Sequence, residues 1–287
     1  MRVLLTMPHV FDPKEGSLYS SQTEAKREIK TKALQRATIE NLMRHGKRHW
    51  IHASLGKSKP VVTRELATTK GIDLTIQIYT PPAATLSDTL KGDSRLEILD
   101  PKIKDYKQVP LLASKRALEQ ANNYDVIGYL EDDLLIEDPD FFAKIHNLVE
   151  RTGGDYAFIP HRYEQIPELG DVILSGDPDG VRDDLFWATG ECIQLRWQLG
   201  PVRFYRATNP HSGCYFLTRD QASRVLEYWV QRNWIPEFQL SGPLEQAGSG
   251  LLLPVLKVMK PVPDHYRFLM VRHLDELWQR HRLEKTA

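Results

Sequence analysis

The sequence predicts an α/β protein with a mainly parallel central sheet, because short apolar segments alternate with helical segments along much of the chain. A buried strand is expected at residues 2–10, and a long helix is expected at 23–45. A second apolar strand is expected at 124–130, and three carboxylates follow it at once. Ligands of parallel sheets bind beyond the carboxyl ends of the strands, so a functional site is expected there.

The remaining elements follow from periodicity and from turn residues. Strands are expected at 50–55, 73–79, 156–160, 251–259 and 266–271, and helices at 110–120, 139–150 and from about Thr218 to 233. Asp138 and Pro139 offer an N-cap and a first residue for the helix at 139–150. The helix at 23–45 is expected to bury a face made by Ala25, Ile29, Ala33 and Ala37. Residues 87–108 and 164–184 read as loops.

Composition excludes several classes of protein. Lys plus Arg equals Asp plus Glu, so no overall positive charge favours nucleic acid. No stretch approaches the length of a membrane span, and the first residues do not resemble a signal peptide. The two cysteines, Cys192 and Cys214, do not make a disulfide framework and read as small apolar residues. A cytoplasmic protein is therefore expected, whereas its oligomeric state is left open.

The three carboxylates after the strand are Glu131, Asp132 and Asp133. Adjacent carboxylates at a strand end repel each other unless a cation or a ligand offsets their charge. Mn²⁺ or Mg²⁺ is the expected cation, since these metals take oxygen ligands and are usually shared with substrate phosphates. A solvated turn that caps the next helix is the alternative. Asp138 is already available as that cap, which favours the metal–phosphate site.

The stretch "YLEDDLLIEDPDFF" resembles the acidic motif of GT-A glycosyltransferases and is most similar to that of the N-acetylglucosaminyltransferase I group. The resemblance implies a GT-A-like, Rossmann-like sheet flanked by helices, with a smaller acceptor-side lobe. It implies a nucleotide-sugar half at 1–160 and an acceptor half at 161–287 within one continuous domain. It also implies a UDP-sugar donor, with Asp133 on the metal and with Glu131 and Asp132 on the ribose and the metal's waters.

The same resemblance implies further binding residues. The end of the first strand would lie beneath the nucleotide base, which makes Pro8, His9 and Asp12 candidates; a plain exit from the strand is the alternative. A turn in the second half would hydrogen-bond sugar hydroxyls through Asn209, His211 and Ser212, with Gly213 allowing close backbone approach; a structural turn is the alternative. A histidine near the C-terminus would complete the metal site, and His273 matches this arrangement better than His265.

An inverting transferase needs a carboxylate base for the acceptor hydroxyl. Glu245 is the first candidate, Asp184 or Asp183 the second and Glu191 the third, although Glu245 also reads as a charge at a helix N-terminus. Three basic residues would offset the charge of the diphosphate, namely Lys260, Arg267 and Arg272, with solvated surface charges as the alternative. Three tryptophans would stack on sugar rings, namely Trp187, Trp197 and Trp234, with core packing as the alternative.

Three functions remain open at this point. The first is metal-dependent transfer of a sugar from a nucleoside-diphosphate sugar to an acceptor hydroxyl, with inversion or retention undecided. The second is sugar nucleotidyl transfer, which usually needs a Gly-rich phosphate loop after the first strand; "PHVFDPKEG" holds one glycine. The third is a non-catalytic GT-A-like module that binds a sugar or nucleotide.

Overall fold

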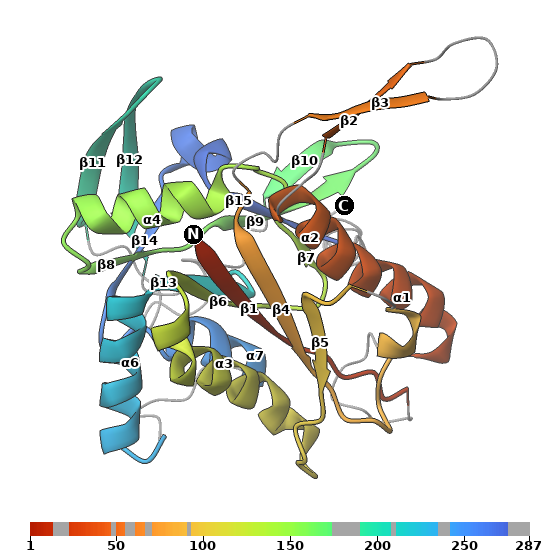
Figure 1. Cartoon of the computed structure of the whole chain (residues 1–287). Helices are drawn as coiled ribbons and strands as arrows, with labels where there is room; N and C mark the ends of the chain where they lie inside the picture. Colours follow the sequence, from red (N-terminus) through yellow and green to blue (C-terminus); the bar gives the residue numbers. More distant parts are fainter. Residues whose placement is uncertain are drawn as a thin grey trace.

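A five-stranded sheet forms the centre of the protein (Figure 1). The computed structural model describes residues 1–13, 23–46, 50–54, 61–66, 71–90, 93–173, 190–207, 211–234 and 242–274, with backbone only at 50–54 and 61–66. The strands of the central sheet, in spatial order, are β13 (Cys214–Thr218), β6 (Val126–Leu130), β1 (Arg2–Pro8), β4 (Asp73–Tyr79) and β5 (Leu96–Leu99). All neighbours in this sheet are parallel except β13, which is antiparallel to β6. The predicted class, a mainly parallel α/β sheet, is confirmed.

Helices cover both faces of this sheet (Figure 1). Val3 and Leu5 of β1 pack into a core shared with α1 (Arg27–Gln35), α2 (Asn41–His45) and α4 (Phe141–Arg151). Leu4 points the other way, into a core shared with α3 (Val109–Glu119) and α6 (Arg219–Gln231). A strand that is buried on both faces must be apolar at almost every position, which is the pattern of β1.

Two four-stranded sheets and one hairpin complete the strands. Their orders are β10 (Gly170–Ile173), β9 (His161–Ile166), β15 (Met270–His273) and β7 (Leu134–Leu135); β11 (Cys192–Trp197), β12 (Gly200–Arg206), β14 (Lys257–Pro261) and β8 (Tyr156–Phe158); and β2 (Trp50–Ser54) with β3 (Val61–Leu66). Strand β7 follows the acidic triplet directly, so the first of these sheets borders the expected site.

Short helical segments join the larger elements. They are η1 (Glu24–Lys26), η2 (Arg36–Glu40), η3 (Ser87–Thr89), η4 (Tyr106–Gln108), η5 (Ala121–Asn123), α7 (Pro243–Glu245), η6 (Gln246–Gly250) and η7 (Pro263–Phe268). Because η2 links α1 to α2 without a break, residues 24–45 form the long helical element that was predicted.

Several predicted elements are confirmed with small shifts of their ends. Strand β4 has the predicted bounds, and β1, β6, β8, α3 and α6 lie within a few residues of the predicted ones. Helix α6 starts after Thr218 with a capping box, in which the side chain of Gln221 accepts the Thr218 backbone N–H at 3.2 Å. The local signals at these positions agree with the tertiary packing.

Other predictions were wrong. Residues 87–108 contain edge strand β5, and 164–173 hold part of β9 and all of β10, because a short strand interrupted by Gly and Pro reads as a loop. The apolar run at 251–256 forms buried turns before β14, since such a run does not distinguish a strand from another buried segment. Strand β15 likewise starts only at Met270, after η7.

Two details of the helices also differ from the prediction. Ala25 and Ile29 are exposed, and burial starts at Ala33 and Leu34, because the C-terminal part of this helical element packs on the core. Helix α4 starts at Phe141, two residues after the predicted start. Asp138 accepts the backbone N–H of Asp140 at 2.9 Å and pairs with Lys144 at 2.5 Å, so it stabilises the turn before the helix.

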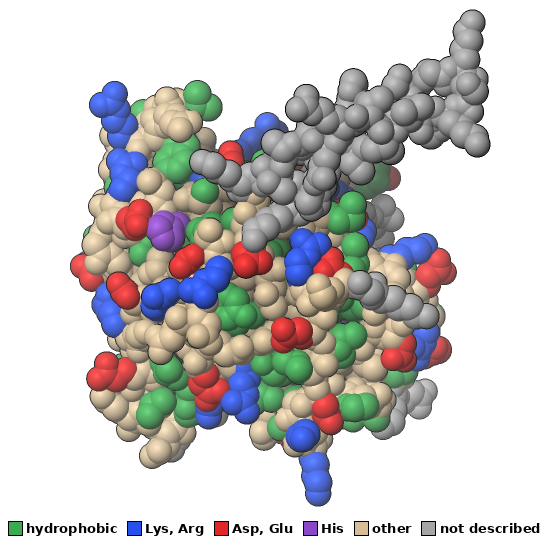
Figure 2. Space-filling model, viewed as in Figure 1, with side chains coloured by type: hydrophobic (Ala, Val, Ile, Leu, Met, Phe, Trp, Pro, Cys, Tyr) green, Lys and Arg blue, Asp and Glu red, His purple; other side chains and the backbone are tan. Residues whose placement is uncertain are grey.

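Acidic and basic side chains alternate over the face of the molecule seen in Figure 2, as expected for a chain with zero formal net charge. Within the described parts of the chain, no helix has the length and apolar character needed to cross a bilayer. Cys192 is exposed, contrary to its reading as a buried apolar residue, whereas Cys214 is buried in the central sheet.

The long helical element is joined to β7 by buried polar side chains. The Asn41 side chain donates to Leu134 O at 3.3 Å and accepts the Ile136 backbone N–H at 2.9 Å. His45 Nε2 lies 2.8 Å from Ile136 O. These bonds satisfy backbone groups of a two-residue strand that has little ladder of its own. The segment after the acidic triplet is therefore fixed to the helix that covers it.

We expect Asn41→Ala to lower the free energy of unfolding by about 1–3 kcal/mol, because it leaves the buried N–H of Ile136 unsatisfied. Urea denaturation measures this loss. Arg44→Ala, on the exposed side of the same helix, is the matched control, and its effect should stay within about 0.5 kcal/mol. Equal losses in the two variants would contradict the role given to Asn41.

Candidate active site

The acidic triplet lies in a tight turn between β6 and β7. Leu134 N donates to Glu131 O at 3.2 Å, which closes the turn. Glu131 N donates to Gly213 O at 2.9 Å, and Leu274 N donates to Asp133 O at 2.9 Å. The backbone of the turn is thus fixed on one side by the start of β13 and on the other by the end of β15.

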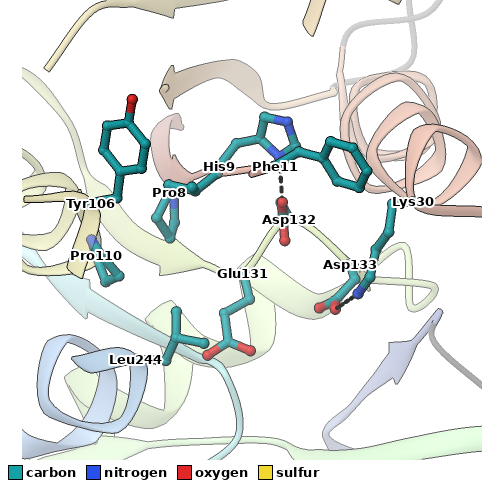
Figure 3. Close-up of a pocket in the computed structure, with 11 residues that line it drawn as sticks. Pro8, His9, Phe11, Lys30, Tyr106, Pro110, Glu131, Asp132, Asp133 and Leu244 are labelled. Atoms are coloured by element: carbon teal, nitrogen blue, oxygen red, sulfur yellow. Dashed lines mark hydrogen bonds and ion pairs between the residues drawn. The ribbon is translucent and has the colours of Figure 1, made fainter. Parts of the chain in front are cut away.

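The three carboxylates point in different directions (Figure 3). Asp132 points to His9 at the end of β1, whereas Asp133 points to Lys30 of α1. Glu131 points toward Leu244 of α7. The nearest labelled neighbour is therefore different for each acid, although the charge of Arg162 acts on both Glu131 and Asp133.

His9 holds Asp132 in place. The backbone N–H of Leu86 donates to His9 Nε2 at 2.9 Å, so Nε2 carries no proton. The proton is then on Nδ1, which donates to Asp132 Oδ2 at 2.5 Å. Both ring nitrogens of His9 are therefore engaged within the protein, where they orient Asp132, and the ring also lines the pocket. The contact of His9 with a nucleotide stays a prediction.

Asp133 meets the predicted metal ligand His273. Asp133 Oδ2 is 3.4 Å from His273 Nε2, and the other ring nitrogen, Nδ1, is 2.6 Å from Glu164 Oε1. Strand β15 pairs with both β7 and β9, and this pairing brings Asp133, His273 and Glu164 side by side from distant parts of the chain. Two ligands of one divalent cation lie about 3 Å apart when each bond is about 2.1 Å, so the Asp133–His273 spacing is close to that of a shared metal.

Glu131 is buried beside β13 and β9. Its Oε2 lies 3.8 Å from Arg162 Nη1. Gly213 has φ +67°, and a Cβ added there would lie 2.7 Å from Glu131 Oε2. A glycine is therefore required at 213, both for its backbone conformation and for its approach to Glu131. The close approach predicted at Gly213 is to a carboxylate of the chain itself.

The charges of this cluster set the ionisation of its members. Burial raises the pKa of Glu131 to about 8, with Arg162 opposing this and Asp133 and Glu245 adding to it. Burial also acts against ionisation of Asp133, but His273, Lys30 and Arg162 together hold its pKa below the usual range. Burial lowers the pKa of His273, yet Asp133 and Glu164 outweigh it and raise the pKa to about 9. Asp133 is thus the charged carboxylate, and Glu131 is mainly neutral at pH 7.

Glu245 lies near enough to Glu131 for its charge to be felt there. Its charge contributes to the raised pKa of Glu131, although the two residues are far apart in the sequence. It lies in α7, next to Leu244, which lines the pocket that contains the acidic triplet. The first candidate for a catalytic base is therefore close to the acids.

Other predicted site residues have different surroundings. Ser212 is buried and donates its hydroxyl to Pro160 O at 2.6 Å, and its contact with a sugar stays a prediction. The backbone carbonyl of His211 accepts from Lys260 Nζ at 3.3 Å, and Lys260 is fully buried. Pro8 lines the pocket. Asp12 follows Phe11, which also lines it. Asn209, Asp183, Asp184 and Trp187 lie outside the described residues.

The less favoured candidates have structural contacts. Glu191 pairs with Lys257 at 2.8 Å and with Arg206 at 3.2 Å. His265 Nδ1 accepts the backbone N–H of Arg203, and Arg272 lies 3.6 Å from Glu137. Trp197 packs edge-on against Phe268, and Trp234 stacks on Trp229. Arg267 is exposed.

The pocket beside the acids also contains residues that sequence reasoning missed. Tyr106 and Pro110 form an apolar side with Pro8, and Lys30 comes from α1 (Figure 3). Arg162 and Glu164 come from β9, within a segment that was read partly as a loop. The alternation of "HRYEQI" was the available signal, because it places Arg162 and Glu164 on one face of a strand.

The residues present fit a divalent cation. Asp133 Oδ1 and Glu131 Oε1 are buried, and neither has a hydrogen-bond partner among the described residues. In the described parts of the chain, no cluster of three or more His, Cys, Asp or Glu side chains is arranged to hold a metal. Asp133 and His273 lie side by side, and a metal at this place would have these two protein ligands. This number suits Mn²⁺ or Mg²⁺ bound together with substrate phosphates and water.

Comparison with known proteins gives no family. No family model matches the chain, and no curated protein matches its sequence. Among solved structures, one similar chain is 4-diphosphocytidyl-2C-methyl-D-erythritol synthase from Anaerococcus prevotii, with a TM-score of 0.39, 8% identity and coverage of 91% of this chain and 88% of the other. Another is mannose-1-phosphate geranyltransferase from Thermus thermophilus, with a TM-score of 0.39, 12% identity and coverage of 95% and 75%. The resemblance to the N-acetylglucosaminyltransferase I group stays confined to the motif at 124–142.

We expect Glu131→Gln to stabilise the metal-free protein at alkaline pH. The pKa of Glu131 is raised from 4.5 to about 8 in the fold, so its protonated form contributes stability that is complete below pH 4.5 and is lost as the pH rises toward 8. The variant should exceed the wild type by about 1–3 kcal/mol at pH 8 in EDTA, and by less at pH 5. Urea denaturation at both pH values measures this; a difference that does not depend on pH would contradict it.

Proposed function

We propose that this protein is a metal-dependent glycosyltransferase that moves a sugar from a nucleoside-diphosphate sugar, with UDP as the expected nucleotide, to an acceptor hydroxyl. The observation that carries the proposal is the pairing of Asp133 with His273 at the carboxyl end of β6. A buried carboxylate and an imidazole side by side, with a buried carboxylate oxygen left over, are suited to a cation shared with a diphosphate.

Each residue of the site has a role in this proposal. Asp133 and His273 would hold Mn²⁺ or Mg²⁺, and Glu164 would fix the orientation of the His273 ring. Because the pKa of His273 is raised to about 9, its ring would have to release the Nε2 proton when the cation binds. The cation would supply charge stabilisation for the departing diphosphate. Asp132, oriented by His9, would accept hydrogen bonds from the ribose hydroxyls. Pro8, Tyr106 and Pro110 would provide the apolar surface for the base.

Glu245 is the proposed base in an inverting reaction. It would take the proton from the acceptor hydroxyl as the oxygen bonds to the anomeric carbon and the bond to the diphosphate breaks. Glu131, mainly neutral at pH 7, would donate a hydrogen bond near the same place and would keep Glu245 from facing a second full charge. In a retaining reaction, Glu245 would not have this role.

Nucleotidyl transfer, which forms a sugar nucleotide from a nucleoside triphosphate and a sugar phosphate, is the second candidate. Lys30 favours it, because a basic side chain from the segment after the first strand reaches the acidic turn. The two reactions release different products. A UDP-sugar incubated with Mn²⁺ yields UDP in the first, whereas UTP with a sugar 1-phosphate yields pyrophosphate in the second.

We expect Asp133→Asn to abolish Mn²⁺-dependent binding of UDP, with a loss of at least about a hundredfold, since it removes the charge of a direct ligand. Calorimetry with UDP, with and without Mn²⁺, measures binding, and circular dichroism checks the fold. Asp138→Asn, in the same segment but engaged with Lys144, is the control and should bind as the wild type does. UDP binding by the wild type that ignores Mn²⁺ would contradict the metal–diphosphate proposal.

We expect Glu164→Gln to weaken Mn²⁺ binding by about 10–100-fold while leaving the chain folded, because the neutral amide holds the His273 ring less firmly. Electron paramagnetic resonance of free Mn²⁺ measures the affinity without need for turnover. Gln165→Glu, on the opposite face of β9, is the control for a charge change on that strand and should have little effect. An unchanged affinity in Glu164→Gln would remove Glu164 from the site.

A further inference from the structure

The ammonium group of Lys30, in the pocket, already faces Asp133, the proposed metal ligand. Lys30 Nζ lies 3.6 Å from Asp133 Oδ2 (Figure 3). The same oxygen faces His273 Nε2 at 3.4 Å. The two side chains are 18% and 13% exposed, so water screens this pair only in part. Lys30 thus lies where the charge of a divalent cation would be felt most strongly.

The helix that carries Lys30 is fixed to its neighbours, and the ammonium group pairs with Asp133. Arg27, one turn earlier in α1, places its guanidinium 4.8 Å from the centre of the Phe11 ring, which joins the helix to the exit of β1. The ammonium is carried on a flexible four-carbon stem and is not held in a fork geometry. His273, by contrast, is held by β15 and Glu164. When a cation binds at Asp133, Lys30 is therefore the group that can move.

We propose that Lys30 and the divalent cation compete for Asp133, and that Lys30 moves to the substrate's diphosphate when the cation binds. This inference rests on the proposed function and adds that the cation binds tightly only together with the diphosphate. Two cations beside one carboxylate repel each other, and a diphosphate between them offsets that repulsion. The protein would then bind the cation alone weakly and the cation with a nucleoside diphosphate strongly. The ammonium would also contact phosphate oxygens as they gain charge.

The test is Lys30→Met, which keeps the approximate length of the side chain and removes its charge. We expect its affinity for Mn²⁺ alone to rise about tenfold, because the competing ammonium is gone. We expect its affinity for UDP at saturating Mn²⁺ to fall about tenfold, because a charged contact with the diphosphate is lost. Calorimetry measures both, and changes of opposite sign are not the signature of a variant that is merely misfolded.

Two further variants sharpen the test. Lys30→Arg keeps the positive charge and should retain UDP binding within about threefold of the wild type. Lys32→Met, on the same helix but exposed and paired with Glu28, should change neither affinity. The melting temperature of each variant shows whether the fold is kept.

The outcomes separate this inference from the proposed function. Suppose that the wild type binds Mn²⁺ and UDP, and that Lys30→Met either lowers both affinities or leaves both unchanged. This result overturns the competition between Lys30 and the cation but leaves the metal–diphosphate site standing. If the wild type binds UDP equally well in EDTA, and Lys30→Met does not bind UDP, then Lys30 takes the place of the metal. This result overturns both the competition and the metal–diphosphate site. A wild type that binds neither Mn²⁺ nor UDP also overturns both.

Discussion

The partial burial of one ionised carboxylate, that of Asp133, is the constraint on which this site depends. A charge that is largely removed from water is tolerated only when opposite charges lie close to it. Here an imidazole, an ammonium and a guanidinium come from three different elements to supply them. The fold must therefore bring β15, α1 and β9 to the end of β6, and much of the topology outside the central sheet serves that convergence.

The turn that carries Asp133 is short, and its neighbours keep it rigid. Strand β7 has two residues and would not hold a position by its own ladder. It is fixed by β15 on one side and by Asn41 and His45 on the other. A site supported by strands and a helix keeps a more constant geometry than one carried on a free loop. Such geometry matters most when a ligand must meet several groups at once.

The sequence predicted the parts of the site that depend on local pattern. The apolar run of β6 and the acids after it could be recognised, because each is visible within a few residues, whereas His273 was singled out only by the resemblance to GT-A glycosyltransferases. Lys30, Arg162 and Glu164 could not, since only the long-range pairing of β9 with β15 and the packing of α1 bring them to the acids. The role of His9 was also hidden, because it depends on the backbone N–H of Leu86. The proposed halves of the chain and the roles of Asn209 and Asp184 stay predictions.

The direction of β13 has a consequence for how the second half of the chain meets the first. Strands β1, β4 and β6 are parallel, so the segments that leave them emerge at the end of the sheet where the acidic triplet lies. Strand β13 runs the other way, so the segment that enters it, ending in Gly213, lies against Glu131. Variation in length just before β13 would therefore move Gly213 relative to Glu131, whereas the junction with α6, at the other end of β13, is fixed by the Thr218–Gln221 capping box.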